Sequence, residues 1–319
     1  MAPKKESAAS APSSDCLNPV DVLVVGGGPA GLTAAIYLAR FHLKVRVVDS
    51  GQSRAALIPR TRNHAGYPGG IPGVKLLGLM REQAAEFGVT VEDETVEALR
   101  ISGNVFHARC KTQSIAASAV LLATGVVNNR PEMDDASHQT ALQQGFLRYC
   151  PICDGYEITD RKVAVIGTAT HGYNEAMFLR TYTRDVALIA PDAAHALTPE
   201  ERGRLQAAGV AMIDGPCGPL TLSGDAILIP TPSGIERFES CYPALGSVIG
   251  SELAIALGAE ATEDGCLVID RHQRTTVLGL YAAGDVAKGL DQISHAMGEA
   301  AVAATTIRND LAGKAALLR

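Results

Sequence analysis

The 319-residue chain lacks a run of about 18 apolar residues, so we expect no transmembrane helix. It also lacks an excess of basic residues. Its 28 lysines and arginines stand against 34 aspartates and glutamates, which gives a net charge of −6. Sequence-independent nucleic-acid binding needs a basic face, and this balance argues against it. What the chain does have is hydrophobic residues, 47% of the total, which is enough to fill the cores of about two domains.

The first 18 residues (MAPKKESAASAPSSDCLN) contain no apolar stretch of the kind that a secretory signal peptide requires. We expect residues 1–18 to form a disordered leader outside the fold; a targeting arm is the alternative. The seven cysteines are an odd number scattered over a long chain, which does not suit a secreted disulfide framework. We therefore expect a cytoplasmic protein.

A glycine-rich motif follows the first apolar run, Val20–Val25, which suits a buried parallel strand. The order is strand, G-x-G-x-x-G, helix, strand and acid. Gly26 permits a tight turn, Gly28 lets the backbone approach a pyrophosphate, and Gly31 lets the helix pack closely on the strand. Asp49, at the end of the second strand, is placed to accept hydrogen bonds from ribose hydroxyls. The motif in this context predicts dinucleotide binding; a glycine-rich turn without a ligand is the alternative.

The stretch YCPICDGY places Cys150 and Cys153 two residues apart. A zinc site would need two further ligands, and a permanent staple around so short a loop would add little stability. A redox pair is therefore favoured. Pro151 suits the first turn of a helix, whose N-terminus would stabilise a thiolate. Asp154 is placed to move protons, with helix capping as its alternative role. The isolated cysteines have the character of core residues: Cys110, Cys217, Cys241 and Cys266.

Five segments together resemble the flavin disulfide reductases with two dinucleotide folds, and most closely the low-molecular-weight thioredoxin reductases. They are GGGPAG, TRNHAGYPGG, ATG, CPICDG, and AAGD with the Gln-Ile that follows it, and the resemblance spans residues 20–312. It implies an α/β fold of two three-layer, Rossmann-like domains, an FAD cofactor and a homodimer. It also implies that Cys153 takes electrons from the flavin, that Cys150 attacks the partner disulfide, and that Asp154 is the acid and base.

The resemblance also implies a set of FAD-binding residues and no metal site. The FAD set is Gly26, Gly28, Pro29, Ala30, Gly31, Asp49, Asn63, Ala123, Thr124, Gly125, Gly284, Asp285, Gln292 and Ile293.

The FAD domain is expected to be discontinuous, with residues 19–128 and 245–319 flanking a middle domain of residues 129–244. Within it we expect a hairpin at 96–101 and 105–108, an amphipathic helix at 74–87 and an alanine-rich helix at 293–311. His295 on the last helix is a candidate neighbour of the flavin, although an ordinary helix position is the simpler interpretation.

The second glycine loop departs from the pattern. After the strand at 162–166 the central glycine is replaced by Ala169, whose methyl lies where the backbone should close on a pyrophosphate. His171 and Tyr173 add bulk to the same loop. After the next strand, at 185–190, the family pattern implies a His-Arg-Arg cluster for the NADPH 2′-phosphate, but the residue there is Asp192. We expect NADPH binding to be lost; a drifted, poorly working site, or one for NADH, is the alternative.

Two arginines before that next strand, Arg180 and Arg184, are expected to be solvated.

The function predicted from these features is an FAD-dependent disulfide oxidoreductase that does not use NADPH. It would exchange electrons with a thioredoxin-like protein or a small dithiol or disulfide, and its donor could be ferredoxin. An O₂-dependent thiol or dithiol oxidase is the first alternative, although relatives of that kind carry histidine where this chain has Asp154. A flavoprotein redox sensor without turnover is the second. Without a nicotinamide to admit, the cysteine pair is expected to stay against the flavin.

Overall fold

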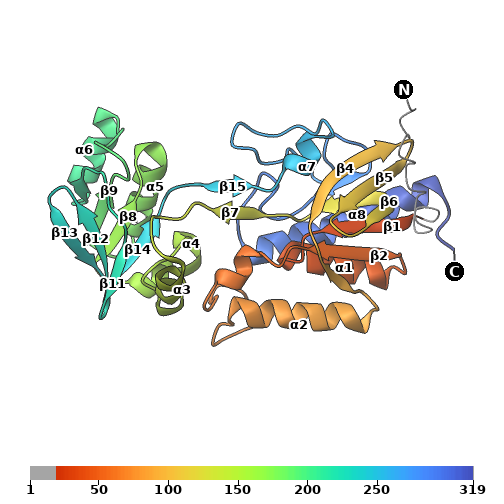
Figure 1. Ribbon diagram of the computed structural model, residues 1–319, viewed down its shortest axis with the longest axis horizontal. Coiled ribbons are helices and arrows are strands. Elements are labelled where there is room, and N and C mark those ends of the chain that lie inside the picture. The colour runs from red at the N-terminus through yellow and green to blue at the C-terminus, as the bar shows by residue number, and fades with distance from the viewer. Residues whose placement is uncertain (1–18, 319) are drawn as a thin grey trace, which may run out of the picture.

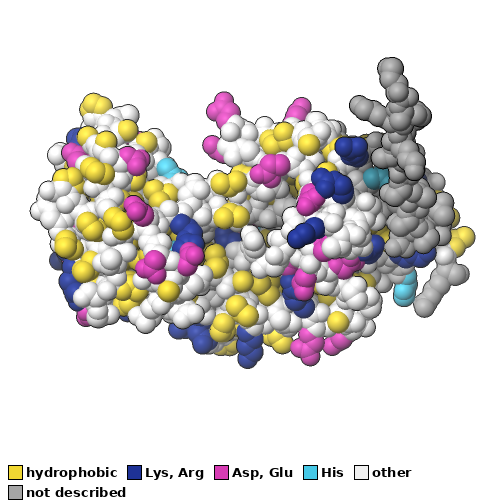
Figure 2. Space-filling model, viewed as in Figure 1, with side chains coloured by type: hydrophobic (Ala, Val, Ile, Leu, Met, Phe, Trp, Pro, Cys, Tyr) yellow, Lys and Arg dark blue, Asp and Glu magenta, His cyan; other side chains and the backbone are white. Residues whose placement is uncertain are grey.

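The computed structural model describes residues 19–318, which form two α/β lobes joined by a narrow two-stranded ribbon (Figure 1). The leader expected at 1–18 lies outside the described residues. In the space-filling view the two lobes form one continuous surface, with a notch between them on the upper edge (Figure 2). No helix in the described range is long and apolar enough to cross a bilayer.

The first lobe contains a seven-stranded sheet in which β1 (Val20–Val25) lies between two parallel neighbours. The apolar run that predicted this strand is buried from Val22 to Val25 because helices and a hairpin cover the two faces of the sheet. The other strands are β2 (Val45–Asp49), β3 (Val91–Asp93), β4 (Val96–Ser102), β5 (Val105–Cys110), β6 (Ser114–Leu122) and β16 (Leu280–Ala282). β4 and β5 form the predicted antiparallel hairpin.

Helices α1 (Pro29–Arg40) and α8 (Ile293–Lys314) cover one face of this sheet, and α2 (Gly73–Glu86) packs beside α1 (Figure 1). The core between α1, α8 and the sheet is rich in alanine, including Ala34, Ala35, Ala300 and Ala303. Small side chains allow the two helices to approach closely. The short elements η2 (Arg54–Leu57) and α7 (Glu252–Ile255) complete the lobe. As a result, α1 and α8 begin at the same end of the sheet, close to the loops that line the site.

The second lobe repeats the parallel βαβ arrangement on a smaller scale. Its four-stranded sheet has the order β10 (Ala211–Ile213), β9 (Val186–Ile189), β8 (Val163–Ile166) and β14 (Ser240–Pro243). Helices α5 (Ala169–Leu179) and α6 (Pro199–Ala207) pack on one face. The other face carries an antiparallel sheet of β11 (Thr221–Ser223), β12 (Ala226–Thr231) and β13 (Gly234–Phe238), together with α3 (Asp135–Gln144). The two short elements α4 (Pro151–Asp154) and η3 (Gly155–Ile158) complete it.

The chain passes between the lobes in two antiparallel strands, β7 (Val126–Asn128) and β15 (Ser247–Ile249) (Figure 1). Asn129 holds the two chain segments together. Its backbone N–H donates to the carbonyl of Gly246 at 3.0 Å, and its side-chain amide donates to the carbonyl of Leu245 at 2.9 Å. The ribbon thereby fixes where the second lobe meets the first.

Candidate active site

One cavity of about 700 Å³ lies between the lobes and gathers the motifs that were far apart in the sequence. The first lobe contributes loops that include Gly28, Thr124, Asp285 and Gln292, and the second contributes the segment around the cysteine pair. Most of the expected FAD residues line it: Gly26, Gly28, Pro29, Ala30, Asp49, Asn63, Ala123, Thr124, Gly125, Gly284, Asp285, Gln292 and Ile293. Gly31 lies just behind the loop, on α1.

The first glycine loop is sterically adapted to a ligand at its surface. Gly26 has φ +109°, and a Cβ there would lie 2.2 Å from the carbonyl oxygen of Ala123. A Cβ at Gly31 would lie 1.9 Å from the carbonyl oxygen of Gly26, so helix and strand could not pack as they do. Gly28 is the N-cap of α1, and no side chain among residues 19–318 caps this end. The free N–H groups at the start of α1 therefore fit a pyrophosphate.

Asp49 lies at the end of β2 and is 4% exposed. Its carboxylate pairs with the guanidinium of Arg81 on α2. It also lies against Gly27, where a Cβ would be only 2.5 Å from Asp49 Oδ2. Arg81 neutralises part of the carboxylate charge, while Asp49 still borders the cavity.

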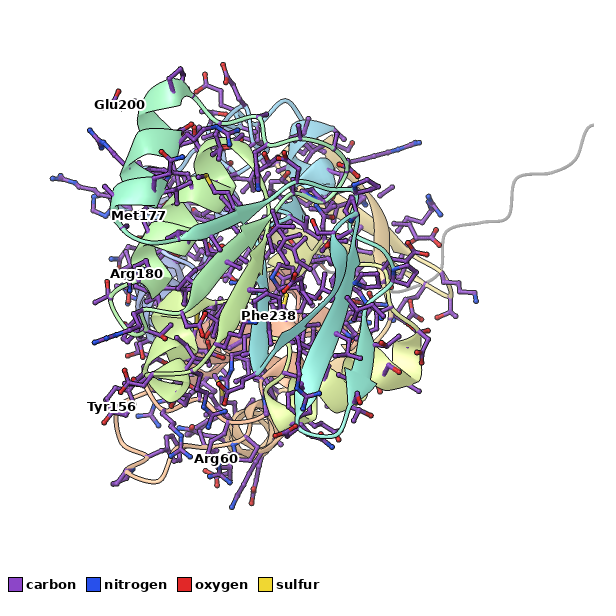
Figure 3. The ribbon with its side chains drawn as sticks, turned by 90° about the vertical axis from the view of Figure 1, so that its left-hand side faces the viewer. Arg60, Tyr156, Met177, Arg180, Glu200 and Phe238 are labelled. Carbon is purple, nitrogen blue, oxygen red and sulfur yellow. A yellow bond between two sulfur atoms is a disulfide. The ribbon has the colours of Figure 1, made fainter. Side chains whose placement is uncertain are left out.

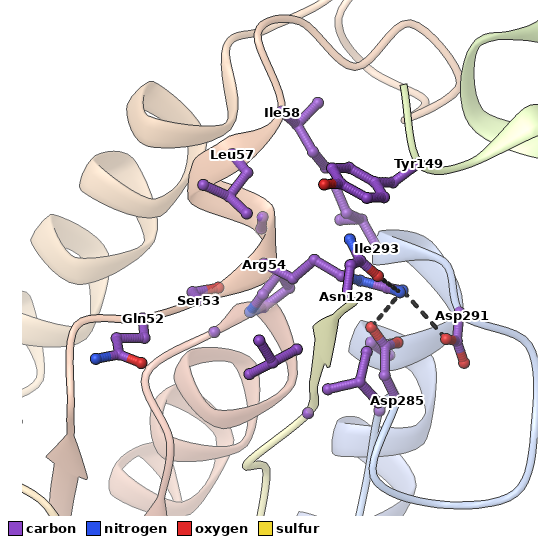
Figure 4. A pocket seen from close by; sticks show the side chains of 18 of the residues that line it. Gln52, Ser53, Arg54, Leu57, Ile58, Asn128, Tyr149, Asp285, Asp291 and Ile293 are labelled. Atoms are coloured by element: carbon purple, nitrogen blue, oxygen red, sulfur yellow. Dashed lines mark hydrogen bonds and ion pairs between the residues drawn. The ribbon is translucent and has the colours of Figure 1, made fainter. Parts of the chain in front are cut away.

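Arg54 is a cavity residue that the sequence reasoning missed. Its Nη2 lies 2.7 Å from Asp285 Oδ2 and 3.2 Å from Asp291 Oδ2, and its Nη1 lies 3.4 Å from Asn128 Oδ1 (Figure 4). Burial raises the pKa of Asp285, and the guanidinium opposes that rise. No local pattern marks this arginine, because its partners lie on other loops and one of them is 231 residues away.

Cys150 and Cys153 form a disulfide at the start of α4, a helix of only four residues. The backbone N–H of Cys153 donates to Cys150 Sγ at 3.1 Å. From the other lobe, Nε2 of Gln292 lies 3.4 Å from Cys150 Sγ and 3.3 Å from Cys153 Sγ. The disulfide therefore borders the same cavity as the glycine loop.

The remaining described cysteines differ from this pair. Cys110 and Cys241 are buried and Cys217 and Cys266 partly so. Burial raises the pKa of each thiol, that of Cys110 to about 11, which keeps them protonated and unreactive at neutral pH. Among residues 19–318 no group of three or more His, Cys, Asp and Glu side chains is placed to hold a metal ion.

Asp154 directly follows the second cysteine of the pair. Its Oδ2 accepts a hydrogen bond from Arg148 Nη1 at 2.8 Å, and its Oδ1 accepts one from the hydroxyl of Tyr242 at 2.9 Å. Burial raises the pKa of this carboxyl, and the charge of Arg148 opposes the rise. A carboxyl whose pKa is raised holds its proton to a higher pH than a free aspartate does, which suits a group that donates a proton.

His295 does not border the cavity. Its Nε2 lies 3.1 Å from Glu299 Oε1, one turn along α8, and the other oxygen of Glu299 accepts the backbone N–H of Gly284 at 2.8 Å. The simpler interpretation, a side chain that helps to hold the helix in place, agrees with these contacts.

The second glycine loop is closed by the protein's own side chains. Ala169 has φ +50°, a left-handed conformation that favours glycine. Thr168 Oγ1 accepts the backbone N–H of Ala196 at 2.8 Å, which draws the loop of residues 190–198 onto the start of α5. Thr170 Oγ1 donates to Glu201 Oε1 at 2.9 Å. A carboxylate therefore lies at the helix end where a pyrophosphate would bind.

Arg180 is not simply solvated as expected. It is half-buried, and its guanidinium donates to the backbone carbonyls of Ala208 at 2.7 Å and Thr183 at 2.5 Å (Figure 3). Arg184 is exposed, as predicted.

A dinucleotide cradle and a disulfide on opposite sides of one cavity define a class, the FAD-dependent disulfide oxidoreductases. The family described as pyridine nucleotide-disulphide oxidoreductase matches residues 20–300, and the chain belongs to it. Within that family it is of the low-molecular-weight thioredoxin reductase type.

One relative and two solved structures illustrate this. The chain is 31% identical to a thioredoxin reductase from Treponema pallidum over 295 residues, which covers 89% of this chain and 94% of the relative. The crystal structure of thioredoxin reductase from Streptococcus pyogenes superposes with a TM-score of 0.84 at 25% identity, covering 92% of this chain and 98% of that one. The atypical thioredoxin reductase TRi from Desulfovibrio vulgaris is 30% identical, with a TM-score of 0.53 and coverage of 93% and 99%.

Proposed function

We propose that this protein is a disulfide oxidoreductase that moves electrons between FAD and the Cys150–Cys153 disulfide, and then exchanges them with a partner, without using NADPH. The observation that carries the proposal is the position of the disulfide, which lies across the cavity from the glycine loop of α1 and within 3.4 Å of Gln292 on the FAD lobe. Electrons can then pass over a short distance within one enclosed site.

The FAD would be held by the residues predicted from the sequence together with Arg54. Gly26, Gly28 and Gly31 shape the loop for the pyrophosphate, and Asp49 would accept the ribose hydroxyls. Arg54 is a cation within the cavity, so it suits the anionic part of the cofactor, and it would exchange its contacts with Asp285 and Asp291 accordingly. Bound FAD would supply the redox centre that exchanges two electrons with the Cys150–Cys153 disulfide.

The chain's own residues perform the exchange with the partner. By family resemblance, Cys153 communicates with the flavin and Cys150 is the attacking thiolate. Cys150 forms a mixed disulfide with one sulfur of the partner disulfide, and the other partner sulfur leaves and takes a proton from Asp154. Cys153 then attacks Cys150, which releases the second partner thiol and restores the disulfide. The two electrons lost by the cysteine pair equal the two gained by the partner.

A thioredoxin-like protein or a small disulfide fits this site as partner. Two apolar side chains close to the disulfide in the sequence are exposed: Ile152, between the two cysteines, at 52%, and Tyr156 at 80%. Figure 3 shows Tyr156 at the surface of the second lobe. Exposed apolar side chains beside a redox centre suit contact with another protein. Relatives named thioredoxin reductase support the same choice.

Electrons would come from a donor other than NADPH, such as ferredoxin. Three features of the second lobe oppose a nicotinamide nucleotide: the methyl of Ala169, the acid at Asp192 and the carboxylate of Glu201 at the start of α5. Two of these are negative charges at positions where the nucleotide carries phosphates. An O₂-dependent oxidase would use the same site in reverse, but Asp154 follows the reductase pattern.

An anaerobic mixing experiment tests the proposal. The oxidised flavoprotein is mixed separately with NADPH, NADH and a dithiol, and flavin absorbance is followed. We expect the dithiol to bleach the flavin and the nucleotides to leave it oxidised. Bleaching by NADPH within seconds would show that the second lobe binds nucleotide productively. A sensor without turnover would be recognised by slow reoxidation of the reduced protein by a disulfide.

We also infer a homodimer, as the family resemblance implies, and a cytoplasmic location, which the cysteine usage favours. Sedimentation of the purified flavoprotein tests the oligomeric state, and a monomer at micromolar concentration would contradict it.

A further inference from the structure

The side chain of Gln292 is the contact between the two lobes that touches the reacting atoms. Its Nε2 lies 3.3 and 3.4 Å from the two sulfurs, at the range of an N–H···S hydrogen bond. Gln292 is also the N-cap of α8, so its backbone position is set by a 22-residue helix of the first lobe. The two distances are nearly equal, so the same N–H group can serve whichever sulfur becomes charged.

A second set of hydrogen bonds holds the oxygen end of this amide. Gln292 Oε1 accepts from Asn63 Nδ2 at 2.8 Å, and Asn63 Oδ1 accepts from the hydroxyl of Thr61 at 3.0 Å. Gln292 Oε1 lies 3.7 Å from Cys153 Sγ, farther than Nε2 at 3.3 Å. In this arrangement the NH₂ group is the end of the amide nearer to Cys153 Sγ.

We propose that Gln292 is a catalytic residue, a side-chain hydrogen-bond donor that, beside the backbone N–H of Cys153, stabilises the thiolate formed when the Cys150–Cys153 disulfide is reduced in its docked position. The inference deepens the proposed function, since it concerns the same cysteine pair. A neutral disulfide sulfur accepts a hydrogen bond weakly, whereas a thiolate accepts one strongly. Reduction therefore strengthens a contact that is already in place and needs no rearrangement.

The positively charged side chains around the cysteine pair are already paired with carboxylates, so they do not take the place of such a donor. On the second lobe, Asp154 is paired with Arg148, and Glu157 on η3 is paired with Arg62 of the first lobe at 3.3 Å. Glu175 on α5 interacts electrostatically with Asp154, and Asp291 beside Gln292 is paired with Arg54. The cations are each engaged by a carboxylate, so none of these pairs provides an uncompensated positive charge for a thiolate. Gln292 contributes its dipole without altering this balance.

Titration of the reduced protein tests the role of Gln292. The full-length flavoprotein is reduced chemically, the reductant is removed anaerobically, and the rate of alkylation of Cys150 and Cys153 by iodoacetamide is measured against pH by peptide mass. For Gln292→Leu we expect a thiolate pKa higher by about one unit, which is about tenfold less thiolate at a pH below both values. For Gln292→Glu, which keeps the shape but replaces the donor with a carboxylate, we expect a larger increase.

Two further variants complete the test. Gln206→Leu, on the exposed surface of α6, is the matched control and should titrate like the natural protein. Asn63→Ala removes the residue that orients the amide, so it should raise the pKa by less than Gln292→Leu does. Circular dichroism verifies that each variant is folded. A folded Gln292→Glu protein with an unchanged thiolate pKa would overturn the proposal. The measurement needs no physiological donor or partner, so it stands even if the proposed electron transfer fails.

Discussion

At the residue scale, Asp154 combines burial with a position next to the redox pair. Its partners Arg148 and Tyr242 come from separate parts of the second lobe, which holds the carboxyl in place while burial keeps its pKa raised. A proton donor of this kind is typically worth a factor of about 10² to 10⁴ in rate.

Asp154→Asn tests this role, because asparagine keeps the shape but cannot transfer the proton. We expect the rate of disulfide reduction by the reduced enzyme to fall by about 10²-fold or more, with the flavin still bound. Stopped-flow mixing with a small disulfide measures it. Asp264→Asn, on an exposed loop, is the control. An Asp154→Asn rate within twofold of the natural enzyme would assign the carboxyl a purely structural role.

Glu175 on α5 makes stability depend on pH. Its side chain is 12% exposed, Oε1 is buried without a hydrogen-bond partner among the described residues, and burial together with the charge of Asp154 raises its pKa from 4.5 to about 7. Between pH 4.5 and about 7, the folded protein therefore keeps a proton on Glu175 that the unfolded chain releases. The stability of the protein is unaffected by this carboxyl below about pH 4.5, and it falls as the pH rises to about 7, because the buried carboxyl must then lose its proton.

Replacing Glu175 with glutamine should remove the loss of stability that ionisation of the buried carboxyl causes at higher pH. We expect Glu175→Gln to unfold at a higher denaturant concentration than the natural protein at pH 8, by up to about 2–3 kcal/mol, and to differ little at pH 4.5. Urea titrations of both proteins at the two pH values measure the difference. Equal stabilisation at both pH values would mean that the carboxyl is already ionised in the folded protein.

At the element scale, the two glycine loops show how similar strand–loop–helix units diverge. In the first, α1 begins at Pro29 behind a glycine N-cap, and its end faces the cavity. In the second, α5 begins at Ala169, and its end is covered by residues 190–198 and Glu201. The second unit keeps the strand–loop–helix fold, while the start of its helix is in contact with residues of the protein itself.

Ala169→Gly alone should not restore nucleotide use. Glycine relieves the left-handed backbone at this position, so we expect a gain in stability of up to about 1 kcal/mol. Glu201 and Asp192 remain, so NADPH should still fail to reduce the flavin. Thermal unfolding and the anaerobic assay measure the two outcomes. Rapid NADPH oxidation by this single variant would show that the methyl was the main obstacle.

The sequence allowed the first strand, the glycine loop and the redox pair to be predicted because their signals are local. β1 has the predicted bounds, and the α2 helix and the β4–β5 hairpin lie within a few residues of theirs. Arg54, the sulfur contacts of Gln292 and the covering of α5 by Glu201 could not be predicted. Each joins segments that meet only in the folded chain, and Asn63 and Gln292 are 229 residues apart. The identity of two residues far apart in the sequence does not indicate that their side chains will meet.

At the scale of the whole molecule, the orientation of the lobes keeps the disulfide at the cavity. Besides the ribbon, Gln292 contacts both sulfurs, and Arg62 pairs with Glu157 across the lobes. The ion pair is partly exposed, with side-chain exposures of 54% and 24%, so by itself it contributes at most about 1 kcal/mol.

We expect the docked arrangement to persist in solution. Small-angle scattering of the oxidised protein should fit the lobe arrangement of Figure 1, and the profile should not change on addition of NADPH. Arg62→Ala should leave it unchanged, because the ion pair is weak. A profile that requires a large rotation of the second lobe, with or without nucleotide, would show that the cysteine pair leaves the flavin site.

The two strands of the ribbon leave and re-enter the first lobe side by side, with Asn128 paired to Ser247. The 118 residues between them, 129–246, thus form an inserted domain whose two ends lie side by side at one point of the first lobe. In evolution, this inserted domain could be replaced by one that accepts electrons from a different donor, while the lobe that holds the flavin stays unchanged. The proposed loss of nucleotide binding in one lobe, beside a glycine loop that is kept in the other, is the pattern that such an exchange would leave.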